Sequence, residues 1–356
     1  MYQPKFTITN TILKNIGVIE ACREIIDRAP LLPYYEKQFR QNALVRSVHY
    51  GTHIEGNELN LDQAEKVILG QEVIARERDI QEVINYRKAM EYINESQKLK
   101  VKSQKQEYEI SEDTIKKLHK ITVDKILPKE KCGVYRKTQV VVKNNQTMEI
   151  SFRPPASQEI ESKIYDLIAF IKASRDQDIH PVLKSGIVHY ELVRIHPFLD
   201  GNGRTARAFA TLILFIEGYD IRKFFSLEEY FDRDANKYYR ALQSVEREKG
   251  DLTFWLEYFT TGLAIELSKI KEKVEKISVD GKLRKKLGGK PLLLSDRQLK
   301  IIEYIQEAGY LQNKAFSSLF PMVSEDTILN ELKDLLRAGI VQKQGSTKGA
   351  KYVIRG

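Results

Sequence analysis

The chain has 356 residues, a length that predicts two or three domains, and its composition, with 42% hydrophobic and 30% charged residues, is typical of a soluble globular protein. It has no run of eighteen apolar residues and no basic start followed by an apolar stretch, so we expect neither a transmembrane helix nor a secretory signal. The net charge is +9, and residues 266–356 carry 18 Lys and Arg against 11 Asp and Glu. Because Cys22 and Cys132 are its only cysteines, we expect no disulfide framework and a cytoplasmic location.

Helical periodicity dominates the first three quarters of the chain. Apolar residues at helical spacing predict helices over 34–57, 60–70, 76–95 and 111–127, and later over 157–176, 181–198 and 204–218. Asn60 and Gln63 form a capping pair at the start of the second helix, and Ser111 caps the fourth. The stretch 137–154 breaks the pattern, because two β-rich runs flank Asn144 and Asn145, which predicts a β-hairpin.

The last part of the chain has the pattern of a separate unit. The lysines and glycines of 281–291 predict an exposed linker, and amphipathic helices follow over 295–309, 313–320 and 324–339. Two short strands around a glycine-rich turn complete the unit, which resembles a winged helix. Its third helix would be the recognition helix of a DNA-binding module. That helix is acidic, which disfavours contact with phosphates, so protein contact or target selection is the preferred role.

The densest cluster of chemically useful groups is HPFLDGNGRTAR, residues 196–207. Pro197 disfavours helix at His196, and Gly201 and Gly203 permit a turn before a new helix. The free N–H groups of a helix N-terminus attract anions, and Arg204 and Arg207 share one face of that helix. A magnesium-bound polyphosphate would satisfy this set, with the ion on Asp200. The alternative is a tight interhelical turn that binds no ligand, but the order of these residue types disfavours it.

The same twelve residues meet every fixed position of the signature HPFx[DE]GNGRxxR, and the chain therefore resembles the Fic family. The resemblance implies a mainly α fold. We expect a Fic-type helical bundle with a β-hairpin flap, plus the small C-terminal winged-helix domain. It also implies transfer of AMP from ATP to a hydroxyl side chain of a target protein. The family's kinase branch carries a lysine at the position of Gly203, so the nucleotidyl-transferring branch fits better.

Site roles follow from the resemblance, position by position. It assigns His196 as general base, Phe198 as a core residue and Asp200 as the Mg²⁺ ligand. It assigns Gly201, Asn202 and Gly203 to the phosphate cradle. Arg204 and Arg207 would hold the phosphate tail of ATP. Tyr239, in ANKYYRAL, is our candidate for stacking on adenine, with a core tyrosine as the nearly equal alternative.

A second motif, GTHIEGN at 51–57, resembles the end of the family's inhibitory pattern [ST]xxxE[GN]. Glu55 would pair with Arg207 and so block the arginine that holds the terminal phosphate, in a charge-assisted and even bidentate contact. Gly51 stands where the family prefers Ser or Thr, which would weaken a cap or contact at that position. A glutamate that only ends a helix is the alternative.

These assignments divide the chain into four parts: 1–110, a helical region with the inhibitory helix; 111–276, the Fic core; 277–292, the basic linker; and 293–356, the winged helix. A target protein would dock on the flap, 139–152. Self-modification and a homodimer are left open, nucleic acid is not favoured, and no membrane is expected. Two alternatives remain. One is removal of AMP by the same site, and the other is a nucleotide-sensing regulator that binds DNA.

Overall fold

The computed structural model describes residues 2–29, 31, 33–102, 110–143, 150–174, 179–286, 295–321, 323–345 and 349–355. The chain divides into two compact units. One comprises Met1–Ala29 and Tyr35–Val274, and the other Pro30–Tyr34 and Glu275–Gly356. None of the helices in the described part combines the length and apolar character that a membrane span requires.

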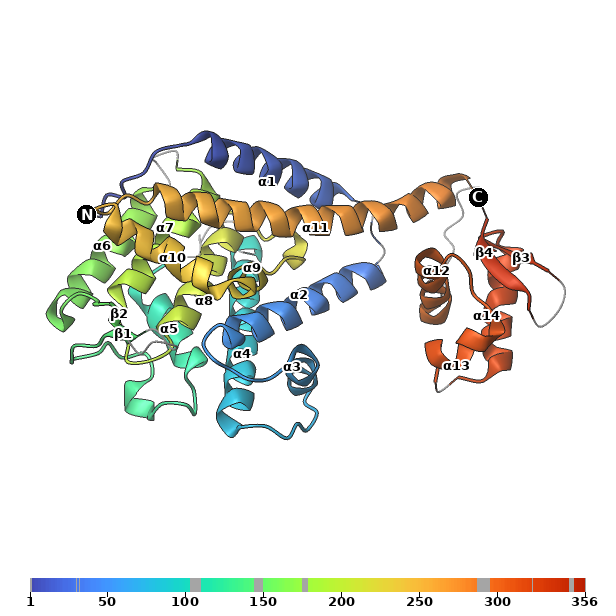
Figure 1. Ribbon diagram of the computed structural model, residues 1–356, viewed down its shortest axis with the longest axis horizontal. Coiled ribbons are helices and arrows are strands. Elements are labelled where there is room, and N and C mark those ends of the chain that lie inside the picture. Colours follow the sequence, from blue (N-terminus) through green and yellow to red (C-terminus); the bar gives the residue numbers. More distant parts are fainter. Residues whose placement is uncertain are drawn as a thin grey trace. The chain divides into compact units, whose positions relative to one another are not determined.

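The larger unit is almost entirely helical, as the periodicity predicts (Figure 1). Its helices are α1 (Asn10–Arg28), most of α2 (Pro33–His53), α3 (Leu61–Ile68), α4 (Glu77–Lys102), α5 (Glu112–Thr122), α6 (Ile160–Ala173), α7 (Pro181–Ile195), α8 (Asn202–Ile216), α9 (Leu227–Arg233), α10 (Ala235–Arg247) and α11 (Thr253–Lys286) as far as Val274. Short 3₁₀ turns lie at Lys129–Lys131, Ser157–Glu159 and Ile221–Lys223. The capping box at α3 is present, because Asn60 and Gln63 bond to each other's backbone N–H groups.

Helix α8 lies at the centre of this unit and packs against α4, α5 and α7. Almost every residue of α8 is buried, including its two arginines, as its apolar sequence predicts. Helices α1 and α11 run side by side, joined by bonds of Thr9 to Glu257 and of Asn15 to Thr260 and Thr261 (Figure 1). The loop 196–201, which connects α7 to α8, is therefore held between two buried helices.

The predicted hairpin is present as a small antiparallel sheet. Strand β1 (Val142–Lys143) pairs with β2 (Ile150–Phe152), with Val142 opposite Phe152 and Lys143 opposite Ile150. Its predicted turn at Asn144 and Asn145 lies outside the described residues.

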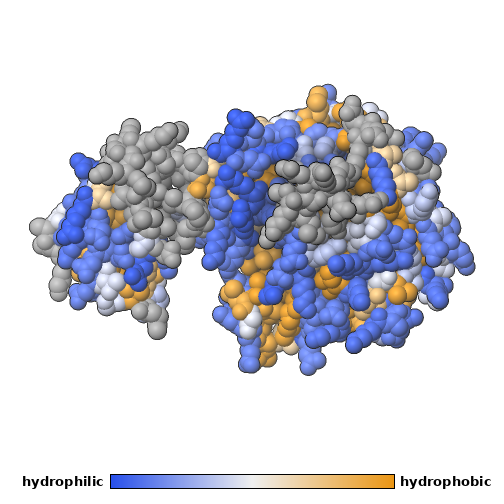
Figure 2. All heavy atoms as spheres, turned by 180° about the vertical axis from the view of Figure 1, so that it is seen from behind, coloured by the Kyte–Doolittle hydropathy of each residue, from blue (hydrophilic) through white to orange (hydrophobic). Residues whose placement is uncertain are grey.

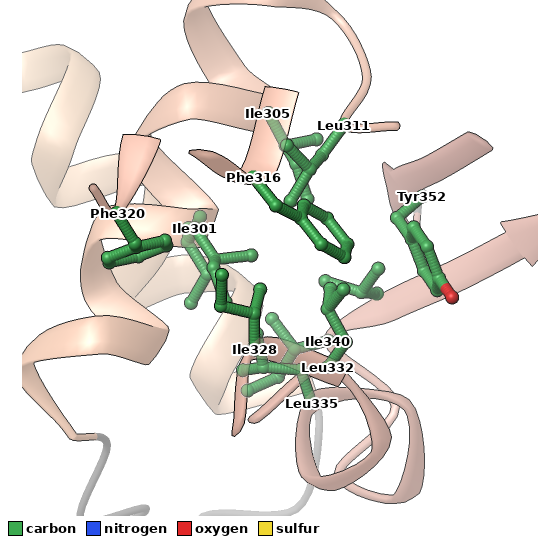
Figure 3. Close-up of a cluster of buried hydrophobic side chains, with 12 residues drawn as sticks. Ile301, Ile305, Leu311, Phe316, Phe320, Ile328, Leu332, Leu335, Ile340 and Tyr352 are labelled. Atoms are coloured by element: carbon green, nitrogen blue, oxygen red, sulfur yellow. The ribbon is translucent and has the colours of Figure 1, made fainter. Parts of the chain in front are cut away.

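The smaller unit contains the three predicted helices and a hairpin. They are α12 (Asp296–Ala308), α13 (Phe316–Leu319) after a 3₁₀ turn at Asn313–Ala315, and α14 (Glu325–Arg337), followed by the antiparallel strands β3 (Val341–Gln344) and β4 (Lys351–Ile354). A hydrophobic cluster of its own, with Phe316, Leu332 and Tyr352 among its members, holds these elements together (Figure 3). The unit thus has an independent core.

Helix α11 differs from the sequence prediction. We expected an exposed linker over 277–292, whereas α11 continues to Lys286 and covers its first part. The leucine, lysine and arginine residues there favour helix, and one glycine costs only about 1 kcal/mol in a long helix. Residues 287–294 lie outside the described part of the chain. Figure 2 shows, on the coloured part of the larger unit's visible face, mostly hydrophilic side chains with hydrophobic patches between them.

Candidate active site

His196 ends α7 in the left-handed conformation, with φ 49° and ψ 58°. Its Nδ1 lies 3.3 Å from the Val193 carbonyl oxygen. Because a carbonyl can only accept, Nδ1 carries the proton and Nε2 keeps its lone pair. Burial lowers the pKa of His196 below its usual value, against the opposing effect of the Val193 hydrogen bond. The imidazole is therefore neutral near pH 7, with Nε2 able to accept a proton.

The loop after His196 is closed by its own side chains. Gly201 has φ +74°, a conformation that favours glycine, and α8 begins at Asn202, two residues before the expected start at Arg204. The Asn202 side chain accepts from the Phe198 N–H and donates to the Phe198 carbonyl, both at 2.9 Å. Phe198 is fully buried, as predicted. Asn202 therefore shapes the proposed cradle through its side chain.

Asp200 is surrounded by donors. Its Oδ1 accepts from the Gly201 N–H at 2.5 Å and from Arg204 Nη2 at 3.2 Å, while Oδ2 accepts from Arg78 Nη2 at 2.8 Å. Burial alone would raise the pKa of Asp200, but Arg204, the Gly201 N–H and Arg78 outweigh it and lower the pKa. Asp200 is therefore a carboxylate at neutral pH.

Arg207 and Glu55 form the predicted ion pair. Arg207 Nη2 lies 2.7 Å from Glu55 Oε1 and also donates to the Gly51 carbonyl at 2.9 Å. One carboxylate oxygen takes part, so the contact is not bidentate as we had allowed. Burial would raise the pKa of Glu55, but Arg207 and Arg204 outweigh it, and the pKa falls below its usual value. Both partners are charged at pH 7.

Two glycines near this pair leave space that a side chain would fill. A Cβ at Gly203 would overlap Glu55 Oε1, and a Cβ at Gly51 would overlap the Tyr86 ring. The expectation that Gly51 weakens the inhibitory segment is therefore incomplete. A side chain there would collide with Tyr86, and it is the Gly51 carbonyl that holds Arg207.

Buried donors of both arginines remain without a hydrogen-bond partner. Within the described residues, this is true of Nε and Nη1 of Arg207 and of Nε of Arg204. Only 1% of the Arg207 side chain is exposed, so these unmade bonds are costly. An anion with several oxygens, such as a nucleotide phosphate, would satisfy them.

The amino-acid sequence was also compared with known protein families. Residues 109–214 match the Fic/DOC family model. The chain contains a Fic domain.

Curated relatives include the protein adenylyltransferase fic-1 of Caenorhabditis briggsae, 32% identical over 48% of this chain and 32% of that protein. Another is the protein adenylyltransferase Fic of Nematostella vectensis, 28% identical over 55% of this chain and 44% of that protein. The chain thus spans about a third to under half of the length of these relatives.

Two solved structures share the fold. A Fic family protein from Desulfovibrio desulfuricans G20 aligns over 100% of this chain and 99% of its own, with a TM-score of 0.65 at 23% identity. A fragment of Fic-1 from C. elegans covers 76% of this chain and 74% of its own, with a TM-score of 0.57 at 23% identity. The predicted helical fold with a β-hairpin is confirmed.

His119 of α5 contacts the loop 196–201, and the sequence analysis did not identify it. Its ring stacks on Phe198, with centroids 3.6 Å apart. Its Nδ1 accepts from the Gly133 N–H at 2.9 Å, and its Nε2 donates to the Asp200 carbonyl at 3.0 Å. Burial lowers the pKa of His119 to about 4, so it stays neutral and fixes the backbone at Asp200.

Arg136 is the second missed residue. Its buried guanidinium donates to His196 O at 2.8 Å and, on the flap side, to Thr138 O at 3.1 Å and Pro155 O at 2.7 Å. The Arg136 N–H also bonds to the Pro197 carbonyl at 2.9 Å. Arg136 therefore joins both arms of the flap to the backbone of the signature loop. None of the motifs that the sequence analysis singled out includes Arg136.

Replacing Arg136 with lysine is expected to lower the free energy of unfolding by about 1–3 kcal/mol, because an ammonium group cannot reach all of these carbonyls. Urea denaturation measures the change. Arg153→Lys is the matched control, since Arg153 is exposed on the same hairpin segment. An Arg136→Lys protein as stable as wild type would contradict the assigned role.

Tyr239 of α10 lies beside the inhibitory segment. Its hydroxyl donates to the Ile54 carbonyl at 3.3 Å, and 37% of the residue is exposed. The core role that we weighed for Tyr239 belongs to its neighbour Tyr238, which is buried and bonds to His189. Tyr239 therefore stays available as the predicted stacking surface.

Proposed function

We propose that the chain transfers AMP from ATP to a hydroxyl side chain of a target protein, with Glu55 restraining the reaction. The observation that carries the proposal is the buried Arg207, paired with Glu55 yet left with unpaired donors inside a full Fic signature. The names of the curated relatives, which are protein adenylyltransferases, support the reaction class.

In this mechanism the target oxygen forms a bond to the α-phosphorus of ATP, and the bond from that phosphorus to the leaving pyrophosphate breaks. His196 Nε2 takes the hydroxyl proton. Arg204, Arg207 and the N–H groups at the start of α8 hold the phosphate oxygens. An extended target segment would add to a strand of the hairpin in 139–152, as in other strand-addition complexes.

Asp200 is the one carboxylate that we propose for a magnesium ion bound together with the nucleotide. No group of three or more His, Cys, Asp or Glu side chains suited to a metal occurs in the part of the chain that is described. Mg²⁺ often uses one or two carboxylates and completes its shell with phosphate oxygens and water. Asp200 fits that role, and the ion would neutralise phosphate charge when bound.

Label transfer tests the proposal. The full chain would be incubated with ATP labelled at the α-phosphate, alone and with cell lysate, and protein-bound label would be measured. Label at the γ-phosphate is the control, because it stays with the leaving pyrophosphate. Transfer of γ-label alone, or of neither, would refute the proposed reaction.

Removal of AMP by the same site is the second candidate. About 29% of the Glu55 side chain is exposed, and its lowered pKa keeps it ionised, so it could orient a water molecule. Release of AMP from a labelled target by wild type, but not by Glu55→Gln, would favour this direction.

The smaller unit is proposed to be a winged helix that contacts protein and binds DNA weakly. In α14, Glu331 is held by Arg297 at 2.9 Å, and Glu325 by Asn313 at 3.1 Å. Asp326 and Asp334 add to the acidic character of the helix. The hairpin after α14 adds lysines that could touch a DNA backbone: Lys343 lies in β3, Lys351 in β4, and Lys348 outside the described residues.

The segment 293–356 is expected to bind duplex DNA more weakly than about 10⁻⁸ M at physiological salt, the weak end of the range for specific regulators. Its own hydrophobic cluster should let it fold alone. Fluorescence anisotropy with a duplex library measures the affinity. Sequence-specific binding at or below that value would instead support the regulator function.

A further inference from the structure

Asp200, the proposed magnesium ligand, already pairs with a positively charged side chain of the protein. Arg78, in the first turn of α4, places Nη2 2.8 Å from Asp200 Oδ2. Its side chain is 59% exposed, whereas Arg204, on the other carboxylate oxygen, is buried. Oδ2 is thus the oxygen that faces the exposed, displaceable partner.

These contacts form a closed ring of two arginines and two carboxylates. Arg78 Nε donates to Glu82 Oε1 at 3.1 Å, and Arg204 Nη1 lies 2.9 Å from the same oxygen. Asp200 closes the ring, since it contacts both arginines. Helix α4 therefore neutralises both a proposed phosphate-binding arginine and the proposed metal ligand.

The ring is tied to the segment that carries Glu55. Asn57, two residues after Glu55, donates to Glu82 Oε2 at 3.0 Å and to the Asp79 carbonyl at 3.0 Å. Its own Oδ1 accepts from the Leu59 N–H at 3.1 Å. The Asn57 side chain thus links the segment that carries Glu55 to the helix that carries Arg78.

We propose that Arg78 is a second inhibitory contact, whose guanidinium stands where a divalent cation must approach Asp200. The inference rests on the proposed function, because it assumes that the site takes a metal-bound nucleotide. A guanidinium and a divalent ion at one carboxylate oxygen repel each other, so the ion binds only when Arg78 leaves. The Arg78 side chain is long and exposed, and when it leaves, the buried Glu82 keeps its contact with Arg204.

The test measures how strongly Mn²⁺ improves binding of ADP to the full chain. ADP lacks the terminal phosphate that Glu55 would oppose, so the measurement isolates Arg78 from Glu55. Calorimetry with and without MnCl₂ gives two ADP affinities, and their ratio is the metal effect. In Arg78→Ala this ratio should exceed the wild-type ratio about two- to fivefold, the size of an exposed ion pair.

Arg76→Ala is the matched control. Arg76 is 55% exposed in the same region and pairs with Asp79 and Glu58, so its loss removes equal charge from a nearby site. Its ratio should match wild type. Adding Asp200→Asn to Arg78→Ala should remove the gain, because the carboxylate that receives the ion is lost.

Three results would overturn the inference: an Arg78→Ala ratio equal to or below wild type, a gain that survives Asp200→Asn, or no effect of Mn²⁺ in any variant. None of these measurements depends on catalysis. If label transfer fails while the Mn²⁺ gain appears, the proposed reaction is wrong and the Arg78 contact stands. If transfer succeeds without the gain, only the Arg78 inference fails.

Discussion

His196→Ala is expected to reduce AMP transfer about 10²- to 10⁴-fold, the usual effect of losing a general base. Nucleotide affinity should change little, because the donors assigned to phosphate belong to Arg204, Arg207 and the start of α8. Label transfer and calorimetry with ADP give the two quantities separately. His180→Ala is the matched control, since His180 caps the opposite end of α7. Transfer within a few-fold of wild type would remove His196 from the mechanism.

The same assignment predicts the pH dependence. A general base works when it is unprotonated, so the transfer rate should fall as acid protonates His196. Burial lowers the pKa of His196 below its usual value of about 6.5, so this fall belongs below pH 6.5 and the rate should be level near pH 7. A rate that still rises between pH 7 and 8 would point to another base.

The site residues of the signature could be predicted because they are adjacent in sequence and lie at a turn that the glycines indicate. The Glu55–Arg207 pair spans 152 positions, yet it was predicted because both ends lie in recognisable motifs. Helix positions followed from periodicity, since each helix buries one apolar face. These parts of the structure depend on local pattern.

The residues that support the site from other parts of the chain could not be predicted from local sequence patterns. His119, Arg136, Arg78 and Glu82 reach the site from other helices and loops, and no spacing in the sequence relates them to it. His119 and Arg136 act on backbone carbonyls, which carry no sequence signal. Glu82 and Arg78 resemble an ordinary i, i+4 pair on a helix surface until the fold places Asp200 and Arg204 beside them.

The role of Gly51 could also be recognised only in the three-dimensional structure. The sequence shows only a departure from Ser or Thr. The fold shows that Tyr86 fills the space beside it and that the Gly51 carbonyl accepts from Arg207. Arg207 therefore keeps its bond to the Gly51 carbonyl even when Glu55 is removed.

Glu55→Gly is expected to raise AMP transfer, including self-modification, and to strengthen binding of ATP more than of ADP. Removing the carboxylate frees Arg207 Nη2 from its 2.7 Å contact and takes a negative charge away from the region of the terminal phosphate. A hydrogen bond to a charged group contributes about 1.5–3 kcal/mol, which corresponds to roughly tenfold to a hundredfold in affinity. The lower end is expected, because the Gly51 carbonyl still shares Nη2 with the incoming phosphate.

Adding Arg207→Ala to Glu55→Gly should cancel the ATP gain, because both changes act on one contact and cannot be additive. Calorimetry of ATP and ADP against wild type, both single variants and the double variant measures the coupling. Glu58→Gly is the matched control, since Glu58 is 74% exposed on the same segment and pairs with Arg76. ADP affinity should stay nearly constant in Glu55→Gly, because ADP has no terminal phosphate to meet the freed guanidinium. If ATP affinity and transfer are the same in wild type and Glu55→Gly, the ion pair is only a helix-end contact, and the restraint on this site lies in other groups.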